Sequence, residues 1–174
     1  YKAEDLAHVP ANASEALRHA GTAVYANRHL KQVFHCNRRP YVPGAATPPY
    51  DPPRPVDPGY FFQTLFDYGE HGEDLDPTEV RPWMSRGDPW SDRRAGFDLR
   101  SNRLCRRILF YNRFEELDPG NPAPAWVPVK GLEFSYANAD FTQPAASPVD
   151  AEKLTSIAEA GYGFDGAGGI ARTA

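Results

Sequence analysis

The stretch Gly96–Phe114, GFDLRSNRLCRRILFYNRF, decides the fold. It mixes arginines with aliphatic and aromatic side chains and contains no proline, so nothing in it interrupts an extended chain. Because successive side chains of a strand point to opposite faces, Arg106 shares a face with Ile108 while Arg107 lies opposite. The stretch predicts one long strand, or two strands joined at Ser101–Asn102.

The arginines of this region raise the question of nucleic-acid or phosphate binding. On a strand they are divided between both faces, and the whole chain carries a net charge of -4, so no continuous basic patch forms. Their distribution instead favours ion pairs to neighbouring strands, including the acidic turn described below. The arginines concerned are Arg100, Arg103, Arg106, Arg107 and Arg113.

Other segments share the strand pattern of alternating, β-branched and aromatic residues. The segment Tyr60–Tyr68, YFFQTLFDY, is apolar on both faces, which indicates burial between layers. The last segment runs into a glycine-rich end that we expect to be flexible. The predicted strands are Val24–Cys36, Tyr60–Tyr68, Val129–Tyr136 and, beginning at Ala151, a strand through Gly161.

Eighteen prolines and 14 glycines favour short strands joined by turns over long helices. Eight of the prolines lie in Arg39–Pro58, which predicts an extended, polyproline-like excursion. A rigid surface loop is the favoured interpretation; recruitment of an SH3-type partner through its PxxP pattern is the alternative. We also expect an irregular loop at Arg81–Arg94, anchored by Trp83 and Trp90, and a helical turn at Ser14–His19.

Composition limits the class of protein. With 41% hydrophobic and 13% aromatic residues the chain is not disordered as a whole, and its 174 residues suit one domain or a piece of a larger one. No apolar run is long enough to span a membrane, and the first 14 residues lack a signal-peptide pattern. The predicted class is mainly β, with antiparallel strands and long Pro-rich loops, over residues 1–174.

An acidic segment after Tyr60–Tyr68 holds the strongest candidates for catalysis or metal binding. Calcium favours several loop carboxylates, and zinc favours histidine with carboxylate, but the spacing does not fit an EF-hand. We therefore favour a solvated acidic turn that closes a hairpin, and expect no cofactor and no metal. The segment contributes Asp67, Glu70, His71, Glu73, Asp74 and Asp76.

Nucleophilic and phosphate-binding chemistry finds no support in the motifs. Cys36 and Cys105 lack CxxC partners, and we expect two reduced thiols, although a single disulfide between them stays open. No GxSxG elbow occurs, and the glycine-rich GYGFDGAGG is not followed by the Lys-Ser/Thr of a phosphate loop. We expect a protein that is not an enzyme.

Several segments, in the same order and with similar gaps, resemble the SpvB-like region of bacterial insecticidal toxin complexes. The arginine-rich stretch matches the family's GF-(E/D)-(V/L)-R-x-x-R-L-C-R-R pattern almost position for position. A second pattern ends in Tyr-Gly-Asn-Arg, where this chain has His35-Cys36-Asn37-Arg38. The resembling segments are Tyr1–Asp5, Tyr25–Tyr41, Leu65–Asp74, Arg86–Leu117 and Leu154–Tyr162.

The resemblance implies a role in a toxin complex. In this family the region forms part of a β-sheet shell, or cocoon wall, that encloses a toxic effector and does not itself modify host targets. It implies that the partners are other segments of the same toxin chain and other components of the complex, with no nucleic acid and no insertion into membranes. It also implies secretion, with residence in the cytoplasm before release.

Two other functions remain open. The chain could be the amino-terminal part of an ADP-ribosylating virulence toxin, or a hydrolase that uses the acidic turn. It could also be a β module that binds a partner or a glycan through the Pro-rich loop or through Trp83 and Trp90. An isolated wall segment would leave strand edges open, so we expect this chain to be poorly soluble alone or to pair with other strands.

Overall fold

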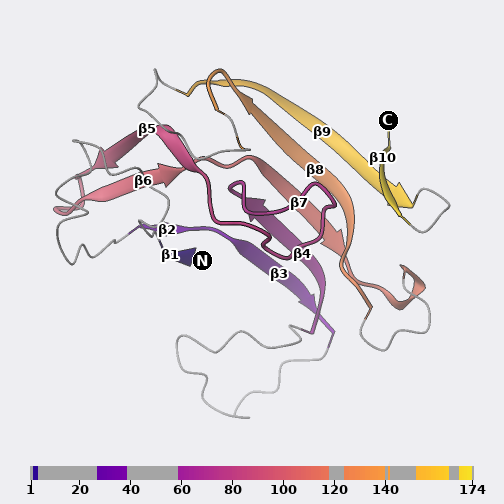
Figure 1. Cartoon of the computed structure of the whole chain (residues 1–174). Helices are drawn as coiled ribbons and strands as arrows, with labels where there is room; N and C mark the ends of the chain where they lie inside the picture. Colours follow the sequence, from indigo (N-terminus) through magenta and orange to yellow (C-terminus); the bar gives the residue numbers. More distant parts are fainter. Residues whose placement is uncertain are drawn as a thin grey trace, which may run out of the picture.

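The structure is a computed structural model of the 174-residue chain; it describes residues 2–3, 27–38, 59–117, 124–139, 141, 152–164 and 169–173. Its centre is an antiparallel six-stranded sheet in the order β10-β9-β8-β7-β4-β3 (Figure 1), and β1-β2 and β5-β6 form two-stranded sheets. The predicted mainly β, antiparallel class is confirmed. The elements are β1 (Lys2–Ala3), β2 (Arg28–His29), β3 (Gln32–Asn37), β4 (Tyr60–Asp67), β5 (Ser85–Asp92), β6 (Leu99–Arg103), β7 (Arg107–Asn112), the 3-10 turn η1 (Glu115–Leu117), β8 (Val127–Tyr136), β9 (Leu154–Phe164) and β10 (Ile170–Thr173).

The arginine-rich stretch forms two strands, β6 and β7, in different sheets. Its predicted junction at Ser101–Asn102 is wrong, because both residues lie within β6 and Asn102 is fully buried. The chain instead leaves β6 after Arg103 and enters the main sheet at Arg107, and the Arg106 N–H donates to the carbonyl of Asp67. The predicted alternation holds in β7, where Arg107, Leu109 and Tyr111 are buried and the residues between them are half-buried.

One face of the main sheet is covered by the segment that joins β4 to β5, which crosses in front of β4 and β7 (Figure 1). This segment carries Leu75 into a core with Leu65 of β4 and Leu109 and Tyr111 of β7. The Tyr111 hydroxyl donates to the Leu75 carbonyl oxygen at 2.8 Å. The segment is therefore part of the core, and it fixes what lies at the end of β4.

The predicted irregular loop at Arg81–Arg94 is wrong over most of its length, because Ser85–Asp92 is β5. Proline rarely enters strands since it cannot donate a ladder hydrogen bond. Here Pro89 lies in the irregular part of the β5-β6 pairing, between the paired residues Ser85 and Trp90, where no donor is needed. Within the described part of the chain this strand pairs only with β6, as an edge strand does.

The other strand predictions are confirmed with shifted bounds. Val24–Cys36 yields β2 and β3, separated at Leu30 and Lys31, and the strand predicted from Ala151 is β9. β8 begins earlier than predicted and includes Pro128, which enters where the register with β7 shifts. β10 was not predicted. The Ser14–His19 turn and the Pro-rich Arg39–Pro58 segment lie outside the described residues.

Cys36 in β3 has a backbone φ of 59°, in the left-handed region that favours glycine. The pattern of the family that the sequence resembles has glycine at this position. Cys36→Gly is therefore expected to raise the free energy of unfolding by about 0.5–1 kcal/mol, because relief of left-handed strain exceeds the extra entropy that glycine gives the unfolded chain. Urea unfolding measures the change.

Leu75 provides the matched control for this prediction. Its φ of 62° is nearly the same, but its side chain is buried in the core. Leu75→Gly should therefore lower stability, since the lost packing outweighs the relieved strain. A Cys36→Gly protein no more stable than the parent would contradict the expectation.

Among the described residues, no strand pairs with the outer edge of β9 over most of its length. β9 pairs with β8 through residues 154–161, whereas β10 covers only residues 161–164 on the other side. Residues 154–159 are all exposed, including Leu154 and Ile157. Among the described residues no helix is long and apolar enough to cross a membrane.

Candidate functional site: a buried cluster of charged side chains

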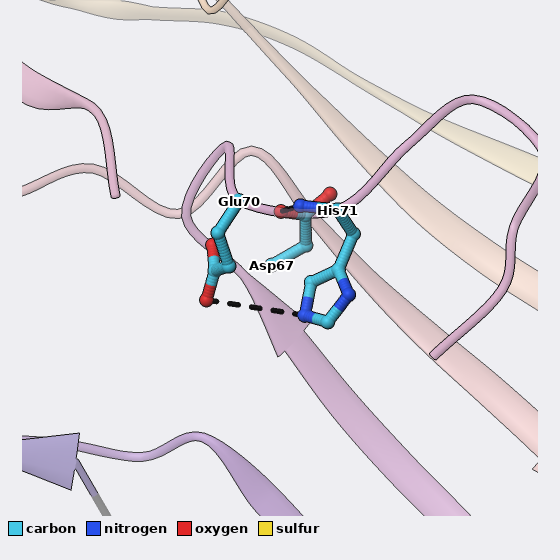
Figure 2. A group of neighbouring side chains, drawn as sticks. All are labelled: Asp67, Glu70 and His71. Carbon is cyan, nitrogen blue, oxygen red and sulfur yellow. Dashed lines mark hydrogen bonds and ion pairs between the residues drawn. The ribbon is translucent and has the colours of Figure 1, made fainter. Parts of the chain in front are cut away.

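The candidate site lies where β4 ends. Asp67 is the last residue of β4, and the chain then turns at Gly69 and brings Glu70 and His71 back beside it (Figure 2). The turn needs glycine, because the φ of Gly69 is 96° and a Cβ there would lie 2.5 Å from the Met84 side chain. Asp67, Glu70 and His71 all have zero exposed area. The prediction of a solvated acidic turn is wrong for these three residues; Glu73, by contrast, is exposed.

Asp67 is fixed by Arg107, its register partner on β7. The Arg107 Nε donates to Asp67 Oδ2 at 2.6 Å, and the Gly69 N–H donates to Oδ1 at 2.8 Å. Burial works to raise the pKa of the Asp67 carboxyl, but Arg107, Gly69 and His71 together hold it below its ordinary value. Asp67 is therefore a carboxylate whose oxygens already have partners.

Glu70 and His71 share a buried cation, the ammonium group of Lys31. Lys31 follows β2 and is 4% exposed; its Nζ donates to Glu70 Oε1 and lies 2.6 Å from His71 Nε2. The other Glu70 oxygen accepts the Tyr68 N–H at 2.7 Å. Burial raises the pKa of Glu70 more than Lys31 lowers it.

The hydrogen bonds of His71 define its tautomer. Nδ1 lies 3.1 Å from the Thr78 carbonyl oxygen, which can only accept, so Nδ1 carries the proton. Nε2 is then the acceptor for the Lys31 ammonium. Burial, and then Lys31, lower the pKa of His71, which keeps the ring neutral. The distance of 3.9 Å between Glu70 Oε1 and His71 Nε2, drawn in Figure 2, is therefore too long for a direct hydrogen bond, and Lys31 bridges the two groups.

The side-chain atoms that could bind a metal ion at this site already have partners within the protein. Asp67, Glu70 and His71 each offer a ligand atom, and these atoms lie within 4.8 Å of one another. However, Lys31 already donates to Glu70 and to the Nε2 lone pair of His71, and Arg107 holds Asp67. A cation would have to displace a buried ammonium. The chemistry of the donor set supports a permanent internal counter-ion instead of a metal centre.

The five predicted arginines lie in three places. Arg106 and Arg107 both reach Glu73, which confirms the predicted ion pairs to the acidic segment. Two others lie on β6: Arg103 covers the Trp83 ring at 5.2 Å, and Arg100 donates to Ser91 Oγ at 3.3 Å. The fifth, Arg113, follows β7 and donates to the Pro124 carbonyl oxygen at 2.6 Å. The structure thus joins only Arg106 and Arg107 to the cluster.

Sequence reasoning missed Lys31 as a member of the site. Alternation along the predicted strand Val24–Cys36 puts Lys31 on one face with His29, Val33 and His35. In the structure Lys31 lies between β2 and β3 and is buried, whereas Val33 and His35 are exposed. The only signal was its place in the RHLK part of a resembling segment. Glu79, whose carboxylate lies 3.6 Å from the Lys31 ammonium, was missed as well.

A surface pocket of about 320 Å³ adjoins the cluster, but its charges are used within the protein. Arg106 pairs with Glu73, and Arg172 donates to Glu133 at 3.0 Å. An anion entering the pocket would have to displace a carboxylate. The pocket is lined by Glu73, Arg106, Arg107, Glu133, Phe134, Ser135, Phe141 and Arg172.

The cysteines are free thiols in the structure and are not paired with each other. Cys36 is exposed, whereas burial raises the pKa of the Cys105 thiol to about 12, with Asp67 and Glu70 adding to the effect. A thiol with so high a pKa is a poor nucleophile. Cys105 donates to the Arg107 carbonyl oxygen and serves packing.

Sequence comparison relates the chain to known proteins. The profile of the family described as Salmonella virulence plasmid 65 kDa B protein (SpvB) matches residues 1–114. The mono(ADP-ribosyl)transferase SpvB of Salmonella typhimurium strain 14028s is 34% identical over 124 residues, which cover 67% of this chain. The chain spans 19% of the length of that relative, and the same figures hold for the protein of Salmonella dublin.

Solved structures show the same fold. The N-terminal domain of the effector protein SpvB from Salmonella typhimurium strain LT2 is 28% identical, with a TM-score of 0.66, over 94% of this chain and 46% of that one. The TcdB2-TccC3 structure without its hypervariable C-terminal region is 25% identical, with a TM-score of 0.67. That match covers 99% of this chain and 7% of the other.

Proposed function

Since the chain belongs to the SpvB family, we propose that it is a non-enzymatic structural segment of a bacterial toxin complex. In this role it forms part of a β-sheet shell that encloses a toxic effector and helps to deliver it. Its partners are other segments of the same toxin chain and other components of the complex. The complex is secreted, after residence in the cytoplasm.

The observation that carries this proposal is that the charged cluster is closed to solvent. A catalytic carboxylate or imidazole must reach a substrate. Asp67, Glu70 and His71 have zero exposed area, and their polar atoms bond to Arg107, Lys31 and backbone groups. The cluster joins β4, β7 and the segment after β2, so it serves to hold the sheet together.

The open edge of β9 also supports a wall segment. Natural proteins protect exposed strand edges with proline, lysine or bulges. The exposed run LTSIAE of β9, residues 154–159, contains no proline and a single charge, Glu159, and its pairing with β8 is irregular at Thr155. Such an edge suits a sheet that continues into neighbouring strands, as a shell requires.

A transferase role is the second candidate, because the curated relatives are named mono(ADP-ribosyl)transferases. The solved SpvB structure that matches is an N-terminal domain, and we propose that this chain corresponds to that part and does not transfer ADP-ribose. Substituting Asp67, Glu70 or His71 separates the candidates. A structural role predicts lost stability, whereas a catalytic role predicts lost turnover with the free energy of unfolding unchanged.

Strand pairing at the β9 edge is tested by placing a charge on it. Ile157→Lys is expected to shift the chain from self-associated species toward monomer, since lysine on an edge opposes strand addition. Light scattering after size-exclusion chromatography measures the change. Val80→Lys is the matched control: Val80 and Ile157 are both 59% exposed, but Val80 lies in the loop after β4.

Two outcomes would count against the open-edge account. One is a parent chain that stays monomeric at high concentration. The other is an equal effect of Ile157→Lys and Val80→Lys, which would assign the association to general hydrophobic contact instead of strand pairing.

A further inference from the structure

The loop that covers the sheet is closed by His71. The His71 ring donates from Nδ1 to the Thr78 carbonyl oxygen, and an isolated β-bridge pairs His71 with Glu79. The Val80 N–H donates to the Glu70 carbonyl oxygen at 2.9 Å. These bonds fasten the start of the loop to its end, with Leu75 between them in the core.

In the described part of the structure, charged groups surround His71 from several elements. The segment after β2 contributes the Lys31 ammonium, at 2.6 Å from Nε2. The end of β4 contributes Asp67, whose Oδ1 accepts the His71 N–H at 3.4 Å, and the turn contributes Glu70 at 3.9 Å. The returning limb of the loop contributes Glu79 and Arg81; Glu79 lies beside Lys31, and the Arg81 guanidinium donates to the His71 carbonyl oxygen.

We propose that His71 is a proton sensor and that its protonation releases Lys31 and loosens the loop from Gly69 to Val80. A proton from solvent on Nε2 removes the lone pair that accepts from Lys31. It also places an imidazolium and an ammonium 2.6 Å apart in a buried site, where like charges repel strongly. Glu70 is close enough to pair with the imidazolium, and Glu79, beside the surface, can take the displaced ammonium. The connection between the segment after β2 and the loop is then lost.

The direction of the pH effect follows from the two neighbouring groups. The pKa of His71 is lowered on folding, so its contribution to stability is complete above the ordinary histidine pKa of 6.5 and is lost as the pH falls. The pKa of Glu70 is raised, so its contribution is lost as the pH rises. The two pH effects have opposite signs, so the parent chain shows their sum. A His71 variant keeps Glu70, so comparing it with the parent chain gives the contribution of the histidine. This inference does not depend on the proposed shell function.

Hydrogen exchange read by mass spectrometry tests the proposal on the 174-residue chain. Between about pH 7.5 and about pH 5, protection of the amides in residues 69–80, corrected for intrinsic exchange, should fall about tenfold or more, the effect of one unit of differential titration. In His71→Gln, which keeps a neutral polar group, the fall should be much smaller. His35→Gln, at an exposed position, should behave as the parent does.

A parent loop that stays equally protected at both pH values would overturn the proposal, and so would an equal fall in His71→Gln. If that variant does not fold, ring nitrogen NMR of the parent decides. The His71 ring should be the neutral Nδ1–H tautomer near neutral pH and should titrate with the same midpoint as the loop amides. Different midpoints for ring and loop would refute the sensor.

Discussion

Arg107→Met is expected to lower the free energy of unfolding by about 3–5 kcal/mol, because it leaves the Asp67 carboxylate buried without its partner. Arg107 is 3% exposed, and its Nε–Oδ2 bond to Asp67 is 2.6 Å long. The same guanidinium donates to the Gly72 carbonyl oxygen, so the loop over the core loses a contact as well. Urea unfolding, followed by tryptophan fluorescence, measures the loss.

A double variant separates the pair from its surroundings. Asp67→Leu combined with Arg107→Met removes both charges, and replacement of a buried pair by apolar groups is often close to neutral. The double variant should therefore be more stable than Arg107→Met alone. If the single substitution costs less than about 1 kcal/mol, as exposed ion pairs do, the buried cluster does not hold the sheet.

Trp83→Ala is expected to cost about 3–5 kcal/mol, the range for a buried aromatic side chain. Trp83 is 2% exposed and joins three elements: its ring stacks on Tyr68 with centroids 5.2 Å apart, meets His29 of β2 edge-on at 5.3 Å, and lies under Arg103 of β6. Its loss would therefore uncouple the β5-β6 pair from the main sheet.

Trp90 is the matched control on β5. It is 51% exposed, and Trp90→Ala should change the free energy of unfolding by less than about 1 kcal/mol. Thermal unfolding by circular dichroism compares the two variants under the same conditions. Equal effects at the two positions would mean that Trp83 does not anchor the smaller sheet. The sequence suggested that Trp83 and Trp90 together form a binding surface. Because Trp83 is buried, only Trp90 of the two lies at the surface.

Alternation and β-favouring residues were enough to predict β4, β7, β8 and most of β9. Burial alternates residue by residue in β7, whereas residues 154–159 of β9 are all exposed. The sequence pattern did not predict where strands are interrupted. Ser101 and Asn102 are typical turn residues, yet both lie in β6. Pro89 argues against a strand, yet β5 tolerates it at an irregular edge. Local propensity cannot foresee which edge is left without a partner.

The sequence predicted the ion pairs of the candidate site but not the burial of its charged residues. The arginines' pairing with the acidic segment followed from charge and face, as Arg106 and Arg107 show. Burial of Asp67, Glu70 and His71 did not, since consecutive charged residues are usually solvated. Their burial depends on Lys31, 36 residues before Asp67, and on a loop folded back over the sheet. Such long-range compensation leaves no local pattern.

A structure of the protein in its natural assembly, by electron cryomicroscopy, tests the central claim most directly. The shell account expects a strand hydrogen-bonded to the outer edge of β9 along residues 154–160, the main sheet as part of a closed wall, and the Asp67–Glu70–His71 cluster sealed around Lys31. An edge of β9 left in solvent, together with a cluster open to a bound substrate, would contradict it.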